Sequence, residues 1–122
     1  FKIIYPHMAT KVHAEISVIP ITSYLDASPD LESPGMSKQI AVAFDAIRRV
    51  KNVNVILTPM GTQLETSDFN AILNAIDAAH RSLRSEKNIK RIISTIRIDE
   101  RLDKSISLED KVQSVMDKLD EA

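Results

Sequence analysis

The chain has 122 residues, of which 43% are hydrophobic, and a formal net charge of -1. This length suits one hydrophobic core, so we expect a single domain with one site or one interface per copy. The near-neutral charge gives no general attraction to nucleic acid or to a membrane surface, and no apolar run approaches the ~20 residues of a membrane span. Cysteine is absent, which excludes disulfides and thiolate chemistry. The expected location is cytoplasmic.

Residues 1–8 follow neither the period of a helix nor that of a strand. His7 and Met8 stand directly before Ala9 in the manner of a cloning junction. We therefore expect residues 1–8 to be a tag or cloning remnant and residues 9–122 to form the domain. A short native N-terminal arm is the alternative.

A first strand is predicted over residues 11–19, where side chains alternate between two faces. One face carries Ala14, Ile16 and Val18, and the other carries His13, Glu15, Ser17 and Ile19. Residues 22–35 are rich in Ser, Asp, Pro and Gly, which is typical of a loop, and their length favours a lid or an insertion.

A helix is expected next, capped by Ser37, with its apolar positions at helical spacing. These positions are Ile40, Ala43, Phe44 and Ile47. Residues 53–57 and 62–65 favour strands, and residues 59–61, Pro-Met-Gly, are suited to a tight turn between them. The sequence therefore predicts a hairpin.

The second half of the chain predicts two more helices and one more strand. Ser67 or Asp68 opens a helix with one apolar stripe, made of Phe69, Ile72, Leu73, Ile76, His80 and Leu83. Residues 90–99 alternate as a strand, and Ser107 with Asp110 forms a capping-box pattern before an amphipathic last helix.

This order predicts an α+β fold, a ferredoxin-like βαββαβ sandwich with a four-stranded antiparallel sheet and an extra C-terminal helix. The two helices that connect strands cover one face of the sheet. Ile19 and Ile93 are assigned to the other face, which needs a cover of its own. Contact between copies of the chain is the simplest cover.

Candidate catalytic groups are few in this sequence. No serine stands in a G-x-S-x-G pattern, no His pair has metal-ligand spacing, and Gly35 and Gly61 alone cannot build a glycine-rich phosphate loop. His80 is expected to be a buried histidine bonded to backbone or, alternatively, a ligand contact. We expect no catalysis, although a small enzyme that uses Glu15 or His80 as acid or base is a further alternative.

Charged residues on the strands leave two interpretations open. Glu15 in the first strand is expected either to pair with Arg97 or another subunit, or to meet the donors of a ligand. Residues 97–104 mix both signs, which favours ion pairs between subunits over a phosphate clamp. Binding of RNA is disfavoured, because the predicted strands carry no aromatic residue.

Five motifs in order resemble the thiamine-binding, YkoF-like family of small ferredoxin-fold proteins. They are residues 15–21 (EISVIPI), residues 58–62 (TPMGT) with Glu65, Ala79-His80, residues 98–104 (IDERLDK) and residues 110–112 (DKV). The resemblance runs from about residue 11 to residue 119. The proline-rich loop at residues 22–35 is longer than the family's usual loop.

The resemblance implies a homotetramer, a dimer of dimers, that binds thiamine or a related hydroxymethylpyrimidine compound at a subunit interface. An aminopyrimidine needs donors and acceptors, and a thiazolium cation favours a carboxylate and a polarisable wall. The residues suited to these roles are Glu15 and Glu65 for the amine or the cation, Ser17, Ser37, Thr58 and Thr62 for ring nitrogens, and Phe44 and Met60 for the wall.

The expected function is thus that of a small-molecule carrier, buffer or sensor that requires no cofactor. Its partners are copies of itself and the ligand, with no nucleic acid and no membrane. The alternative is an oligomeric regulatory or assembly module whose ligand only tunes association. For residues 58–62, a turn without any ligand contact is equally consistent with the sequence.

Overall fold

The computed structural model describes residues 2–3, 11–22 and 36–121. Its centre is an antiparallel sheet in the order β1-β3-β4-β2-β5. The strands are β1 (Lys2–Ile3), β2 (Val12–Thr22), β3 (Asn54–Thr58), β4 (Gly61–Thr66) and β5 (Ile89–Glu100). The helices are α1 (Ser37–Arg48), α2 (Phe69–Arg84) and α3 (Leu108–Glu121).

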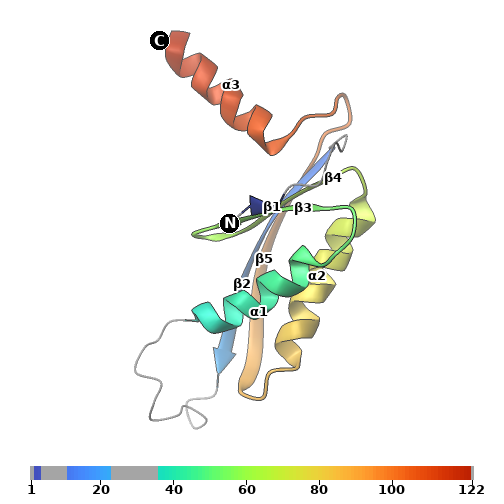
Figure 1. Cartoon of the computed structure of the whole chain (residues 1–122), viewed down its shortest axis with the longest axis vertical. Coiled ribbons are helices and arrows are strands. Elements are labelled where there is room, and N and C mark those ends of the chain that lie inside the picture. The colour runs from blue at the N-terminus through green and yellow to red at the C-terminus, as the bar shows by residue number, and fades with distance from the viewer. Residues whose placement is uncertain (1, 4–10, 23–35, 122) are drawn as a thin grey trace.

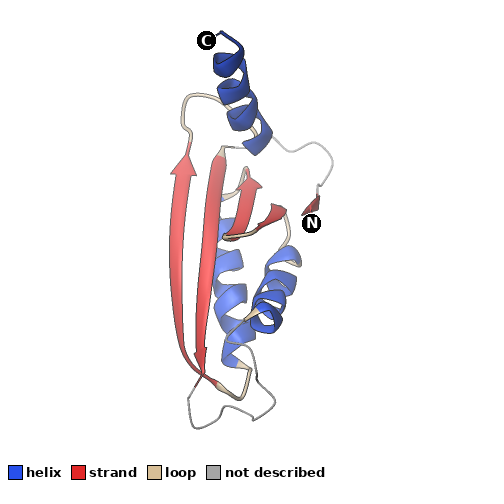
Figure 2. Ribbon diagram, turned by 90° about the vertical axis from the view of Figure 1, so that its left-hand side faces the viewer, coloured by secondary structure: helices blue, strands red, loops and turns tan. Residues whose placement is uncertain are grey.

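The predicted fold class is confirmed. The four predicted strands form one sheet, α1 and α2 cover one of its faces, and α3 follows the last strand (Figures 1 and 2). The two-residue strand β1 adds a fifth strand beside β3, which the sequence did not predict. The assignment of residues 1–8 to a tag stays a prediction, and the loop expected over residues 22–35 lies outside the described residues except for Thr22, which ends β2.

The core lies between the sheet and the two helices, as the alternation in β2 predicts. Ala14, Ile16 and Val18 are buried on the helix-covered face. On α2, however, the buried stripe is shifted from the predicted one, because Phe69 and Leu73 are exposed. The small side chains of Ala71, Ala75 and Ala79 are buried instead, and they allow α1 and α2 to approach closely. The buried helical residues are Ala43, Phe44, Ile47, Ala71, Ile72, Ala75, Ala79 and Leu83.

The helix starts agree with two of the three predictions. Asp68 caps α2 by accepting a hydrogen bond from the Asn70 amide at 3.0 Å. The Ser37 cap is wrong, because α1 already includes Ser37 and its N-cap is Met36, whose carbonyl accepts from the Ile40 amide at 2.9 Å. A serine inside the first turn cannot play the capping role that the residue before the helix plays.

Hairpin β3–β4 turns through Pro59 and Met60, as predicted. The Thr58 hydroxyl donates to the Gly61 carbonyl at 2.7 Å across the turn. A Cβ atom on Gly61 would lie 3.0 Å from the Ile16 carbonyl of β2. Glycine therefore allows the turn end of β4 to approach β2 closely.

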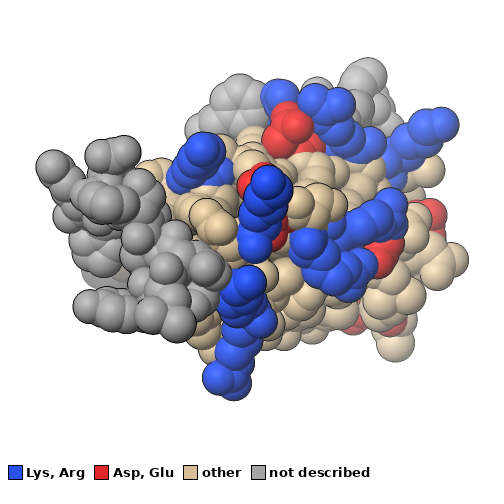
Figure 3. Space-filling view, turned by 90° about the horizontal axis from the view of Figure 1, so that it is seen from below, with Lys and Arg blue, Asp and Glu red and all other residues tan. Residues whose placement is uncertain are grey.

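Charge is distributed unevenly along the molecule. Figure 3 shows that Lys and Arg predominate at the end opposite α3, and Figure 1 places the end of α2 and the start of β5 there. This segment includes Arg81, Arg84, Lys87, Lys90 and Arg91. Acidic residues predominate on α3, namely Glu109, Asp110, Asp117, Asp120 and Glu121. A net charge near zero thus conceals two ends of opposite sign.

Candidate ligand-binding site

The face of the sheet opposite α1 and α2 carries a row of polar side chains. Residues paired across neighbouring antiparallel strands point to the same face. Glu15 of β2 pairs with Gln63 of β4 on one side and with Arg97 of β5 on the other. One pair further along, His13 stands between Glu65 and Asp99. The strand register therefore gathers these six side chains on the uncovered face.

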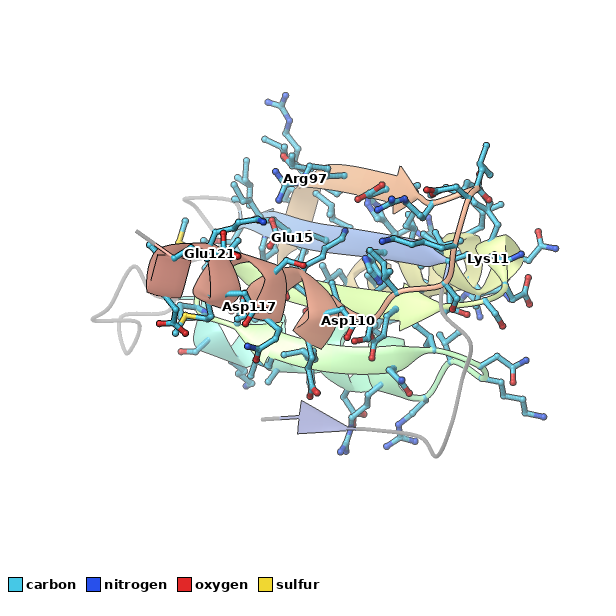
Figure 4. The ribbon with its side chains drawn as sticks, turned by 90° about the horizontal axis from the view of Figure 1, so that it is seen from above. Lys11, Glu15, Arg97, Asp110, Asp117 and Glu121 are labelled. Carbon is cyan, nitrogen blue, oxygen red and sulfur yellow. The ribbon has the colours of Figure 1, made fainter. Side chains whose placement is uncertain are left out.

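Glu15 lies at the centre of this row and its two oxygens have different partners. Gln63 Nε2 donates to Glu15 Oε2 at 3.2 Å. Arg97 Nη2 lies 3.9 Å from Glu15 Oε1, and the Arg97 side chain is 83% exposed while that of Glu15 is 33% exposed. Figure 4 shows both side chains on their neighbouring strands. The predicted pairing of Glu15 with Arg97 is confirmed, as a long and exposed contact.

Three polar contacts tie the start of α3 to the same face. His13 Nε2 donates to the Ile106 carbonyl at 3.0 Å. The Leu108 amide donates to Glu65 Oε2 at 2.8 Å, and Lys111 Nζ lies 2.7 Å from Asp99 Oδ2. The chain turns back over the uncovered face at this point and brings the first turns of α3 to the edge of the polar row.

A capping box begins α3, as the sequence predicted. The Asp110 amide donates to Ser107 Oγ at 3.0 Å, and the Ser107 amide donates to Asp110 Oδ2 at 2.8 Å. None of the residues Leu108–Glu121 is buried. Val112, Val115, Met116 and Leu119 form an exposed apolar stripe.

A pocket of about 990 Å³ lies between the sheet and the first turns of α3. Its polar and charged lining consists of His13, Glu15, Gln63, Arg97, Asp99, Glu109, Lys111 and Gln113. Its apolar lining includes Ile56, Leu108 and Val112. We call this cavity the sheet pocket. Apolar walls with a few polar groups are the usual composition of a small-molecule site.

Electrostatics within the sheet pocket favour a neutral histidine beside an ionised carboxylate. Burial, followed by the nearby positive charge of Lys111, lowers the pKa of His13. The hydrogen bond from Lys111 is the main cause that lowers the pKa of Asp99. At neutral pH the pocket therefore holds carboxylates and cations side by side, with His13 uncharged.

A second pocket, of about 300 Å³, lies on the helix-covered side at the end of the β3–β4 hairpin. It is bounded by the start of α1, the hairpin turn and the middle of β2. Its lining includes five of the eight residues predicted to bind a ligand, namely Ser17, Phe44, Thr58, Met60 and Thr62. Thr62 and Phe44 are buried there, whereas Met60 is 82% exposed. We call this cavity the hairpin pocket.

The eight predicted site residues therefore do not lie together in one site. Of the eight, Glu15 lines the sheet pocket. Ser37 and Glu65 line neither pocket. Both oxygens of Glu65 have partners within the chain, because Asn54 Nδ2 donates to Oε1 at 3.2 Å and the Leu108 amide donates to Oε2. We therefore assign Glu65 to the anchoring of α3.

Of the residues that line the sheet pocket, Glu15 alone was among the predicted contacts, and the polar residues that the prediction missed include Gln63, Asp99 and Lys111. Gln63 could have been found from the strand pattern, because it alternates with the inward-facing Thr62 and Leu64. Lys111 could not have been found in this way, because its position beside the pocket depends on how the chain returns after β5. In the charged run at residues 97–104, Arg101 contacts Asp103, and Asp99 contacts Lys111 of α3. The ion pairs between subunits that were expected of this run stay a prediction.

His80 lies on α2 and contacts the neighbouring strand β5. His80 Nε2 lies 2.9 Å from Ser94 Oγ of β5, so its partner is a side-chain hydroxyl, whereas the sequence analysis expected a backbone group.

Within residues 2–3, 11–22 and 36–121 no three His, Asp or Glu side chains are grouped to hold a metal ion. No helix in that part of the chain is long and apolar enough to cross a membrane.

Comparisons with known proteins identify the family. Residues 14–116 match the model of the thiamine-binding protein family. A UPF0045 protein from Methanothermobacter thermautotrophicus is 32% identical over 108 residues, which cover 88% of this chain and 99% of that protein. The UPF0045 protein YqgV of Bacillus subtilis is 32% identical over 107 residues, 84% of this chain and 91% of YqgV.

The fold also matches a solved structure. The crystal structure of protein MJ1052 from Methanocaldococcus jannaschii aligns with a TM-score of 0.70 at 30% identity, over 86% of this chain and 95% of that one. The family match and these relatives span most of the sequence and agree with the motifs that first suggested the resemblance. The chain therefore belongs to the thiamine-binding protein family.

Proposed function

We propose that this protein binds thiamine or a related hydroxymethylpyrimidine compound in the sheet pocket and releases it unchanged. The observation that carries this proposal is Glu15, a half-buried carboxylate between Gln63 and Arg97 in a pocket of about 990 Å³. Membership of the thiamine-binding protein family supports the class of ligand. The role is that of a cytoplasmic carrier, buffer or sensor.

The chemistry of the pocket suits this class of ligand. A thiazolium cation is stabilised next to a carboxylate, and an aminopyrimidine ring pairs with groups that both donate and accept, such as the Gln63 amide. Apolar side chains at the pocket wall, including Ile56 and Val112, suit the flat faces of the rings. No step of the proposal needs a nucleophile or a cofactor.

A second copy of the chain is proposed to complete the pocket in a homotetramer built as a dimer of dimers. Ile19 and Ile93 are paired neighbours on the uncovered face and are 42% and 38% exposed. The apolar stripe on α3 lies at the border of the same face. Burying these surfaces against another copy would also exclude water from the pocket, which strengthens its charge interactions.

The test is thermal unfolding and calorimetric titration with thiamine. A ligand present at a hundred times its dissociation constant stabilises the folded state by ~2.7 kcal/mol, so wild type should show a clear rise in Tm. Glu15→Gln should bind more weakly by tenfold or more, because the carboxylate charge is lost. Glu86→Gln, which removes an acidic group from the turn after α2, is the matched control and should bind like wild type. Equal binding by E15Q and wild type would contradict the site.

The alternative is an oligomeric regulatory or assembly module whose ligand only tunes association. The exposed stripe on α3 supports it, since this apolar surface needs a partner whether or not a ligand binds. A stable oligomer without any rise in Tm on adding thiamine or hydroxymethylpyrimidine would favour this alternative.

A further inference from the structure

We propose that Arg97 sets the charge selectivity of the sheet pocket, because its guanidinium competes with a cationic ligand for the Glu15 carboxylate. This inference rests on the proposed function and concerns the same site. Arg97 is then a residue that weakens the binding of cations relative to neutral ligands, rather than one that holds the ligand.

The two carboxylate oxygens of Glu15 face different neighbours. Its Oε2 is held by a neutral amide, that of Gln63, at hydrogen-bond distance. Its Oε1 faces the Arg97 guanidinium at 3.9 Å, which is too long for a hydrogen bond and is a charge contact only. A ligand cation that approaches Glu15 therefore meets a carboxylate whose orientation is fixed by one neighbour and whose charge is balanced by another.

The other cation of the sheet pocket, Lys111, already has a carboxylate partner. Lys111 Nζ lies 2.7 Å from Asp99, and this pair also ties α3 to the sheet. Arg97 has a longer contact and a side chain that is 83% exposed, so it can move away from Glu15 at little cost. Figure 4 shows Arg97 extending outward from β5.

The effect of Arg97 on affinity should be small. Contacts between exposed charges contribute little, so removing Arg97 should strengthen the binding of a cation by roughly two- to fivefold. A neutral ligand gains nothing from the removal, because it does not compete for charge. The ratio of the two affinities, rather than either one alone, is thus the quantity that Arg97 controls.

The experiment compares Arg97→Gln with wild type by calorimetric titration of thiamine, whose thiazolium carries a permanent charge, and of hydroxymethylpyrimidine at mildly alkaline pH, where that compound is neutral. R97Q should bind thiamine about two- to fivefold more tightly and bind hydroxymethylpyrimidine as wild type does. The gain should shrink at high salt and disappear in the E15Q background.

The matched control is Arg91→Gln. Arg91 lies on β5 and faces the same side as Arg97, six residues and about 20 Å away along the strand. It tests whether the change in net charge alone alters affinity. Circular dichroism and Tm should show that both variants fold as wild type does.

Weaker or unchanged binding of thiamine by R97Q overturns the inference while leaving the proposed function in place, provided that wild type binds. A loss of affinity for a phosphorylated thiamine alone would mean that Arg97 holds an anion, which also overturns it. If wild type binds none of these compounds, the proposed function fails, and the inference fails with it.

Discussion

The two faces of the sheet differ in the interactions that stabilise them. On the helix-covered face, Val55, Leu64 and Ile72 are fully buried within the chain itself. On the uncovered face, polar residues around Glu15 lie beside exposed Ile19 and Ile93. The first face is stabilised by burial of apolar surface and is complete in one copy. The uncovered face combines charged groups with apolar area that stays exposed to water in a single copy. This combination is typical of a binding surface.

The largest expected effect tests the covered face. Ile72→Ala should lower the free energy of unfolding by about 2–5 kcal/mol, because it leaves a cavity in a fully buried part of the core. Denaturant unfolding measures the loss. Leu73→Ala, at the neighbouring and 48% exposed position, should cost well under 1 kcal/mol. Similar losses for the two variants would mean that the buried stripe of α2 is the one predicted from sequence.

A substitution on the uncovered face should have a smaller effect, and it should change the free energy of self-association rather than that of folding. Ile93→Ala should weaken self-association by roughly 1–2 kcal/mol per copy, since apolar area that becomes buried between copies is lost. Sedimentation over a range of concentrations measures this, and the Tm of the dissociated chain should barely change. An unaltered association constant would show that the copies meet through a different surface.

The smallest effect is a pH dependence that comes from His13. Burial, and next Lys111, lower its pKa in the folded state below 6.5, the ordinary value for a histidine. The unfolded chain then binds more protons, so stability is full above 6.5 and decreases as the pH falls from there through the folded-state pKa. His13→Gln should flatten this part of the stability curve in denaturant unfolding at several pH values. The idea is wrong if H13Q retains the full slope.

Much of the covered face was predictable from local patterns. The alternation in β2, the Pro59-Met60 turn and the Asp68 cap each depend on a few adjacent residues, and the structure confirms them. The buried stripe of α2 was harder, because it depends on how closely two helices pack. Alanine at positions 71, 75 and 79 permits that packing. From sequence alone, however, leucine and phenylalanine are expected to be buried in preference to alanine, because they are larger and more hydrophobic.

The candidate site was predicted less completely. Glu15 and its contact with Arg97 follow from placing two strands side by side, and both were anticipated. The contribution of α3 to the pocket was not anticipated, because Lys111 and Leu108 reach the pocket only through the turn that follows β5. The motif at residues 58–62 pointed to a ligand, yet those residues line a different pocket from Glu15. Whether they contact a ligand stays a prediction.

Among the described residues, the polar contacts that hold α3 to the sheet come from its first turn, and this has a thermodynamic consequence. A helix of 14 residues is marginally stable in water when no tertiary packing supports it. We therefore expect the far half of α3, where Val115 and Leu119 are exposed, to unwind part of the time in an isolated copy. Any partner that covers this half also completes the helix. Amide hydrogen exchange in the last turns would thus report the occupancy of that surface directly, without a label or a known ligand.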